Sequence, residues 1–151
     1  AAELLEFEIN PEEVHRHLFG NQTVQKMAFL ARALGQIEYF GDGRLAILKL
    51  RDADLFHYNL EPDESRDVID MLMNIETLEA AALFREDATN EYKISLRSKG
   101  QIQVLGVAEN LGGGGHVHAA GALVKGDYEK IKDQVVHELL TLLGEKRRTG
   151  S

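Results

Sequence analysis

The chain has 151 residues, a formal net charge of −8 and a hydrophobic fraction of 44%. These values fit one globular domain with a proper core, and the absence of cysteine excludes disulfides and thiolate metal sites. The acidic balance argues against a long nucleic-acid track, which needs a broad basic surface, but leaves room for a short phosphorylated ligand held by a few local cations. No stretch reaches the length of a membrane span, and we expect a cytoplasmic protein without a membrane partner.

The first third of the chain is predicted to form two helices and a hairpin. Pro11 and the acids after it indicate a helix over 11–19, followed by a second helix over 22–34. The apolar residues that give the second helix a predicted buried face are Val24, Met27, Ala28, Leu30, Ala31 and Leu34. Strands over 37–40 and 44–51 flank a Gly-Asp-Gly turn, and the second strand is apolar on both faces, as in a central strand. The following residues, 52–62, show no regular pattern.

The middle of the chain is predicted to form one helix and a strand pair. The helix covers 64–74, and the strands cover 78–86 and 92–98. Alternation along the second strand sets Lys93, Ser95 and Arg97 on the face opposite the core. Arg85 then shares this polar face with Arg97, about four residues away, or roughly 13 Å at ~3.3 Å per residue. Taken alone, the pattern favours two solvated arginines.

The last third is predicted to form a helix over 101–111, a glycine run, a strand over 120–125 and a helix that Asp127 caps and that runs to 143. The expected core face of the final helix is Ile131, Val135, Leu139, Leu142 and Leu143. The order of elements indicates an α/β (α+β) fold: a mixed sheet of about five strands with helices packed on it, preceded by two helices.

The glycine run is the most unusual stretch. Four glycines, 112–115, leave a backbone without Cβ atoms, and its N–H groups could bind an anion. A run of glycine alone fits a flexible joint equally well. His116 and the small residues 119–121 that follow it favour a ligand site.

Three stretches together resemble a known family. The sequence GGGGHVHAAG at 112–121 resembles the signature of the C-terminal domain of DHH-family phosphoesterases. That family includes oligoribonucleases that also dephosphorylate 3′-phosphoadenosine 5′-phosphate, and cyclic-dinucleotide phosphodiesterases. The sequences ALFRE at 82–86 and SLRSKG at 95–100 fit the oligoribonuclease branch, and the resemblance covers nearly the whole chain.

The resemblance implies that this chain is the substrate-binding half of a two-domain enzyme. The metal ligands of the family, which we expect to hold Mn²⁺, lie in the N-terminal DHH domain. We therefore expect no metal, cofactor or catalytic residue in this chain, and no activity from it alone. We expect residues 1–36 to be a helical segment that leads to the absent domain, 37–144 to be the DHH-associated substrate-binding domain, and 145–151 to be a tail.

The resemblance also implies a phosphate-binding site made of Arg85, Arg97, Ser98, Gly113, Gly114, Gly115 and His116. Arginines bind phosphate through two parallel hydrogen bonds, and a histidine donates to a phosphate oxygen or assists the reaction. The expected partners are short single-stranded RNA or nucleotide phosphates, and the DHH domain of the same polypeptide. A homodimer is also compatible with the sequence.

Two other functions remain open. The chain could be a stand-alone nucleotide- or cyclic-dinucleotide-binding regulatory module without catalysis. It could also be a dimerisation or scaffold domain in which the glycine run is only a joint. Binding of a short oligonucleotide or nucleotide bisphosphate separates the last alternative from the others.

Overall fold

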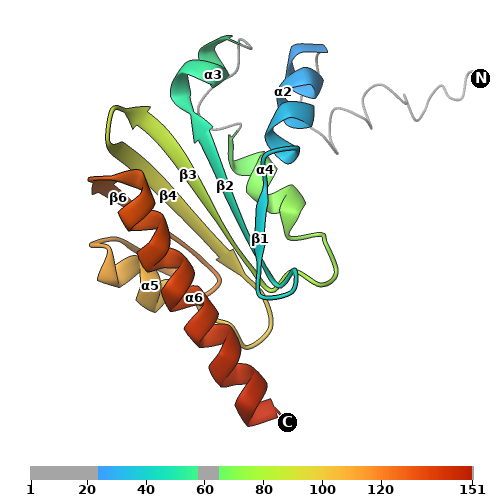
Figure 1. Ribbon diagram of the computed structural model, residues 1–151, viewed down its shortest axis with the longest axis vertical. Coiled ribbons are helices and arrows are strands. Elements are labelled where there is room, and N and C mark those ends of the chain that lie inside the picture. The colour runs from blue at the N-terminus through green and yellow to red at the C-terminus, as the bar shows by residue number, and fades with distance from the viewer. Residues whose placement is uncertain (1–23, 58–64, 151) are drawn as a thin grey trace, which may run out of the picture.

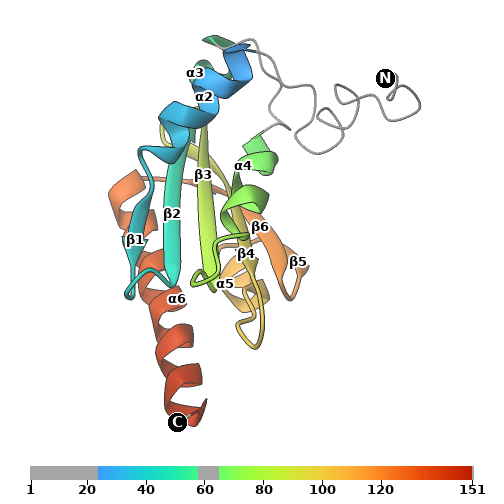
Figure 2. The same cartoon turned by 90° about the vertical axis from the view of Figure 1, so that its right-hand side faces the viewer.

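The protein is built on one mixed sheet with helices on both faces (Figures 1 and 2). The computed structural model describes residues 24–57 and 65–150, so the helix predicted over 11–19 lies outside them. Within the described part of the chain, no helix is long and apolar enough to cross a membrane.

Six strands form the sheet, in the order β1-β2-β3-β4-β6-β5. Their bounds are β1 Glu38–Phe40, β2 Leu45–Arg51, β3 Ala80–Ala88, β4 Glu91–Ser98, β5 Gly114–His116 and β6 Ala119–Lys125. β2 and β3 are parallel, and all other neighbours are antiparallel. The α/β class is confirmed, with one strand more than the five expected because β5 lies inside the glycine run.

The helices form two layers, one on each face of the sheet (Figure 1). On one face lie α2 Val24–Leu34, α3 Asp52–His57 and α4 Ser65–Leu72. On the other lie α5 Leu105–Asn110 and α6 Tyr128–Gly150. Because strand side chains alternate, the central strands β2 and β3 each contribute to two separate hydrophobic cores. β2 shows this, since Leu45 and Ile47 join the α5–α6 core while Ala46 and Leu48 join the other.

The predicted buried face of the second helix was wrong except at Leu30. In α2 the buried side chains are Lys26, Phe29, Leu30 and Ala33, whereas Val24 is 84% exposed and Met27 is 53% exposed. Apolar residues occur on more than one side of this helix, so the three-and-four spacing alone does not single out one face. Lys26 is buried because its ammonium pairs with Asp67 of α4 at 3.0 Å.

Three other boundaries differ from the prediction. The segment after β2, expected to be irregular, begins with the helix α3. The helix expected over 101–111 is reduced to α5, while α6 continues to Gly150 instead of ending at 143. The start of α6 is as predicted, because Asp127 accepts a hydrogen bond from the amide of Lys130 at 3.2 Å.

Candidate functional site

β4 divides its side chains between the two faces of the sheet, as its alternation predicts. Tyr92, Ile94 and Leu96 lie in the core under α5 and α6. Lys93, Ser95 and Arg97 therefore point toward the α4 side. This side is not the open polar face that we expected, because the second hydrophobic core covers its centre beneath α2, α3 and α4.

Arg97 is held in place by two partners. Its Nε donates to Asp70 Oδ1 of α4 at 3.3 Å, and its Nη1 donates to the Leu96 carbonyl at 3.1 Å. A guanidinium carries five N–H donors, so several remain for a ligand. The side chain is 20% exposed, which places Arg97 at the margin of the helical layer, partly ordered and still reachable.

His116 lies in the same row of the sheet as Arg97. Ala119 of β6 pairs with Arg97 on one side and with His116 on the other. Cross-strand partners share a face, so both side chains start from the α4 side of the sheet. Two strand spacings of ~4.8 Å separate their Cα atoms by roughly 10 Å. His116 is exposed, so it is not a residue of the hydrophobic core.

From β4 to β5, the next row consists of small residues. Ser95 pairs with Gly121, and Gly121 pairs with Gly114 at the sheet edge. With Ala119, these residues form a low floor beside Arg97 and His116. A Cβ at Gly114 would meet no atom within 4 Å, so the space above this glycine is open.

The glycine run is not a free joint: Gly112 and Gly113 follow α5, and Gly114 and Gly115 begin the edge strand β5. A Cβ at Gly113 would overlap the carbonyl oxygen of Gly121. Gly115 has φ +140°, and a Cβ there would lie 2.7 Å from Ala120 Cα. A Cβ at Gly121 would lie 2.7 Å from the carbonyl oxygen of Ile94. These glycines let three strands approach closely, a steric reason that the sequence alone did not reveal.

The backbone N–H groups of the glycine run differ in whether they are free to bind a ligand. Gly113 N–H donates to the Ala108 carbonyl at 2.8 Å and so closes α5. A tight two-residue turn joins β5 to β6, so the pair that flanks the turn, His116 and Ala119, is a hydrogen-bonded pair. Gly115 and Ala120 form the next pair along the two strands. In an antiparallel pair these positions alternate, which turns the Gly115 amide away from β6, toward the free edge.

Ser98 does not join this group. It pairs with Ala80, a member of the α5–α6 core, so its side chain lies on the opposite face from Arg97. Its hydroxyl is 3.0 Å from His118 Nδ1, and its amide donates to the His118 carbonyl at 3.0 Å. His118 thus fastens the β5–β6 turn to β4.

Arg85 shares the face of Arg97 but stands apart from it. Arg97 pairs with Ala81, four residues before Arg85 on β3, which reproduces the predicted separation of ~13 Å. The Arg85 guanidinium contacts Asp87 through Nε at 2.6 Å and Nη2 at 3.2 Å. A phosphate at Arg85 would therefore have to compete with a carboxylate.

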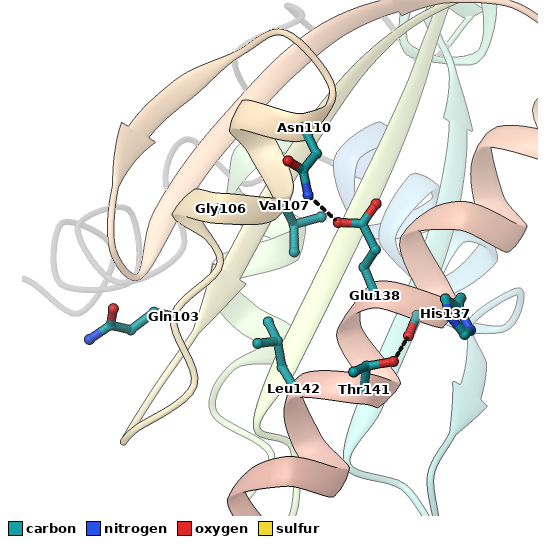
Figure 3. A pocket seen from close by; sticks show the side chains of 8 residues that line it. All are labelled: Gln103, Gly106, Val107, Asn110, His137, Glu138, Thr141 and Leu142. Carbon is teal, nitrogen blue, oxygen red and sulfur yellow. Dashed lines mark hydrogen bonds between the residues drawn. The ribbon is translucent and has the colours of Figure 1, made fainter.

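The other face of the sheet carries a cavity between α5 and α6, shown in Figure 3. It measures about 340 Å³, and Val107 and Leu142 are its apolar members. At its rim, Asn110 Nδ2 donates to Glu138 Oε1 at 2.8 Å. None of the predicted site residues lines it.

The donor set does not fit a divalent metal. Among residues 24–57 and 65–150, no three His, Asp or Glu side chains come together as a metal-binding group. The arrangement of Arg97, His116 and the glycine floor is instead suited to an anion, because it combines cationic and N–H donors with space for a ligand.

The DHHA1 domain model matches residues 42–145. A relative from Thermus thermophilus, described as bifunctional oligoribonuclease and PAP phosphatase NrnA, is 34% identical over 82 residues. The match covers 51% of this chain and 25% of that protein, so the chain corresponds to only part of its relative.

Solved structures share the fold. An exopolyphosphatase-related protein from Bacteroides fragilis superposes with a TM-score of 0.71 at 22% identity, covering 93% of this chain and 43% of that one. The pGpG-specific phosphodiesterase PggH of Vibrio cholerae gives 0.59 at 10% identity, covering 93% and 45%. At these identities the likeness concerns the fold alone.

Proposed function

The chain belongs to the DHHA1 domain family, and on that premise we propose that it is the substrate-binding part of a DHH-family phosphoesterase. The proposed substrates are short oligoribonucleotides, nucleotide bisphosphates or both. The relative described as oligoribonuclease and PAP phosphatase supports this choice. So does the acidic net charge of −8, which suits a short ligand better than a long nucleic acid.

One observation carries the proposal. Arg97 and His116 stand in one row of the sheet on either side of Ala119, and the neighbouring row holds small residues that form the floor of the site. Arg97 offers a bidentate contact to a terminal phosphate. His116 adds a ring N–H from the other side, and the outward Gly115 amide adds a backbone donor at the same edge. Gly114 and Gly121 allow the ligand to approach the backbone closely.

The chemical step is assigned to a separate domain. Metal-dependent phosphate ester hydrolysis needs clustered carboxylates and histidines, and the described part of this chain brings no such group together. We therefore place the manganese ions and the attacking water in a DHH domain of the same polypeptide. The 151-residue chain should then bind ligand without hydrolysing it, even with added manganese.

Titration of the ¹⁵N-labelled chain with a 5′-phosphorylated diadenylate tests the binding site. We expect the largest amide shifts at Gly114, Gly115 and His116, with smaller ones near Arg97. Residues lining the α5–α6 cavity, such as Asn110, should not move. Shifts confined to that cavity, or an absence of shifts at millimolar ligand, would reject the proposed site.

The alternative of a regulatory module predicts the same binding but a different role. It is favoured if the polypeptide that carries this chain, with its remaining domains, binds the diadenylate and releases no nucleotide in the presence of manganese.

A further inference from the structure

Lys93 is a third cation on the face that carries Arg97. It stands four residues before Arg97 on β4, so their Cα atoms are roughly 13 Å apart. Its neighbours in the same row are Arg85 on β3 and Leu123 on β6. The alternation of β4 predicts that Lys93 lies on this face, but Lys93 is not among the site residues that the family resemblance implies.

The charge of Lys93 is not matched by any of the described residues. Arg85 contacts Asp87 through two nitrogens, and Lys49 lies 3.7 Å from Glu86. The Lys93 ammonium, by contrast, makes no hydrogen bond or ion pair with any residue in the described ranges. Like charges directly opposite each other on paired strands are destabilising, and Lys93 stands opposite Arg85. A cation at such a position, without a partner among the described residues, suits an external anion.

Between Lys93 and Arg97, β4 and β6 carry only small side chains, and Ser95 itself is 9% exposed. Only Ser95 lies between them on β4, and its β6 partner is Gly121. Leu123 beside Lys93 is 75% exposed, which gives an apolar contact for a base. Extended lysine and arginine side chains can shorten the gap between their charged groups well below the Cα separation.

The geometry points to Lys93 as a second phosphate subsite. Arg97 and His116 bind the terminal phosphate, and Lys93 binds the phosphate of the next nucleotide along a single strand. This inference rests on the proposed function, because it takes the Arg97–His116 row as the terminal-phosphate site. It deepens that function by making a ligand with two phosphates, one nucleoside apart, the preferred class. Cationic grooves of this kind follow the backbone and not the base sequence.

Two probes separate the subsites: adenosine 5′-monophosphate, with one phosphate, and 5′-phosphorylated diadenylate, with two. Dissociation constants of the 151-residue chain for both would be measured by calorimetry. The variants are Lys93→Gln, Lys93→Arg and the matched control Lys130→Gln, an exposed lysine on α6. We expect the wild type to prefer the dinucleotide by ~10-fold or more. Lys93→Gln should abolish this preference while changing monophosphate affinity by less than about 2-fold.

The arginine variant should keep most of the preference, and Lys130→Gln should keep all of it. A preference that survives in Lys93→Gln, or equal losses for both probes, would overturn the inference while leaving the proposed function intact. If the wild type binds neither probe, the proposed function fails and the second subsite falls with it.

Discussion

Arg97 and His116 stand in one row of the sheet, separated only by Ala119. The row exists because β6 pairs with β4 on one side and with β5 on the other. Backbone pairing, and not a flexible loop, therefore fixes the distance between the two polar side chains. Sites on strands are held more precisely than sites on loops, so the spacing of the row should select the ligand.

Replacing His116 by alanine should separate function from stability. His116 is exposed, so its loss removes little packing, and the free energy of unfolding should change by less than ~0.5 kcal/mol. In the full-length phosphoesterase that we propose, turnover should fall by ~10²-fold or more if the ring stabilises transition-state charge. Thermal denaturation and turnover of the same variant give the comparison, and a large loss of stability would count against the assignment.

Two neighbouring glycines should respond differently to alanine. Gly115→Ala places a Cβ 2.7 Å from Ala120 Cα at φ +140° and should destabilise the fold by more than ~1 kcal/mol. Gly114→Ala meets no atom within 4 Å and should be nearly neutral for stability, while reducing ligand affinity by crowding the floor. Denaturant unfolding measures the difference, and equal effects would contradict the close approach of β5 to β6.

The Ser98–His118 contact should matter for stability and not for binding. The hydroxyl and Nδ1 are 3.0 Å apart and Ser98 is 9% exposed, so Ser98→Ala should cost about 1 kcal/mol. His118→Ala should add little in the double variant, because the two residues share one interaction. The diadenylate affinity should stay within about 2-fold of the wild type. A larger affinity loss would restore Ser98 as a substrate contact, the role predicted from the family motif.

Alkaline pH should lower the stability of the folded protein because the Tyr128 phenol ionises. Burial, and then the charge of Glu38, raises the pKa of the Tyr128 phenol far above its usual range. The folded state thus holds this proton more tightly than the unfolded chain, whose tyrosines titrate near ~10. The resulting stability is complete below pH ~10 and is lost as pH rises toward the folded pKa. The Tm of the wild type should therefore fall more steeply above pH ~10 than that of Tyr128→Phe, and parallel curves would disprove the shift.

Alternation made much of the fold predictable. The faces of β4 and the core side of α6 follow from periods of two and 3.6 residues, and both are confirmed. The same rule already implied that Ser98, one residue after Arg97, lies on the opposite face. The family motif masked this, because it joins the two residues in sequence without distinguishing their directions.

Other features depend on contacts distant in sequence and could not be predicted locally. Glycine has a low strand propensity, so the sequence does not predict β5. The strand is recognised from the pairing of Gly114 and His116 with β6. The buried face of α2 is set by the sheet and by Asp67 on α4, which brings Lys26 inside. The carboxylates that restrain Arg85 and Arg97 are likewise assigned only by the structure: Asp87 lies just past Arg85, and Asp70 lies on another element.

The affinity of one arginine variant tests the central claim most directly. Calorimetry should compare 5′-phosphorylated diadenylate binding by the wild type, Arg97→Ala and the matched control Arg32→Ala, an exposed arginine on α2. A charge-assisted hydrogen bond of roughly 1.5–3 kcal/mol corresponds to a ~10- to 150-fold loss for Arg97→Ala, with no change for Arg32→Ala. Equal losses in both variants, or full affinity in Arg97→Ala, would contradict a phosphate site built on Arg97 and His116.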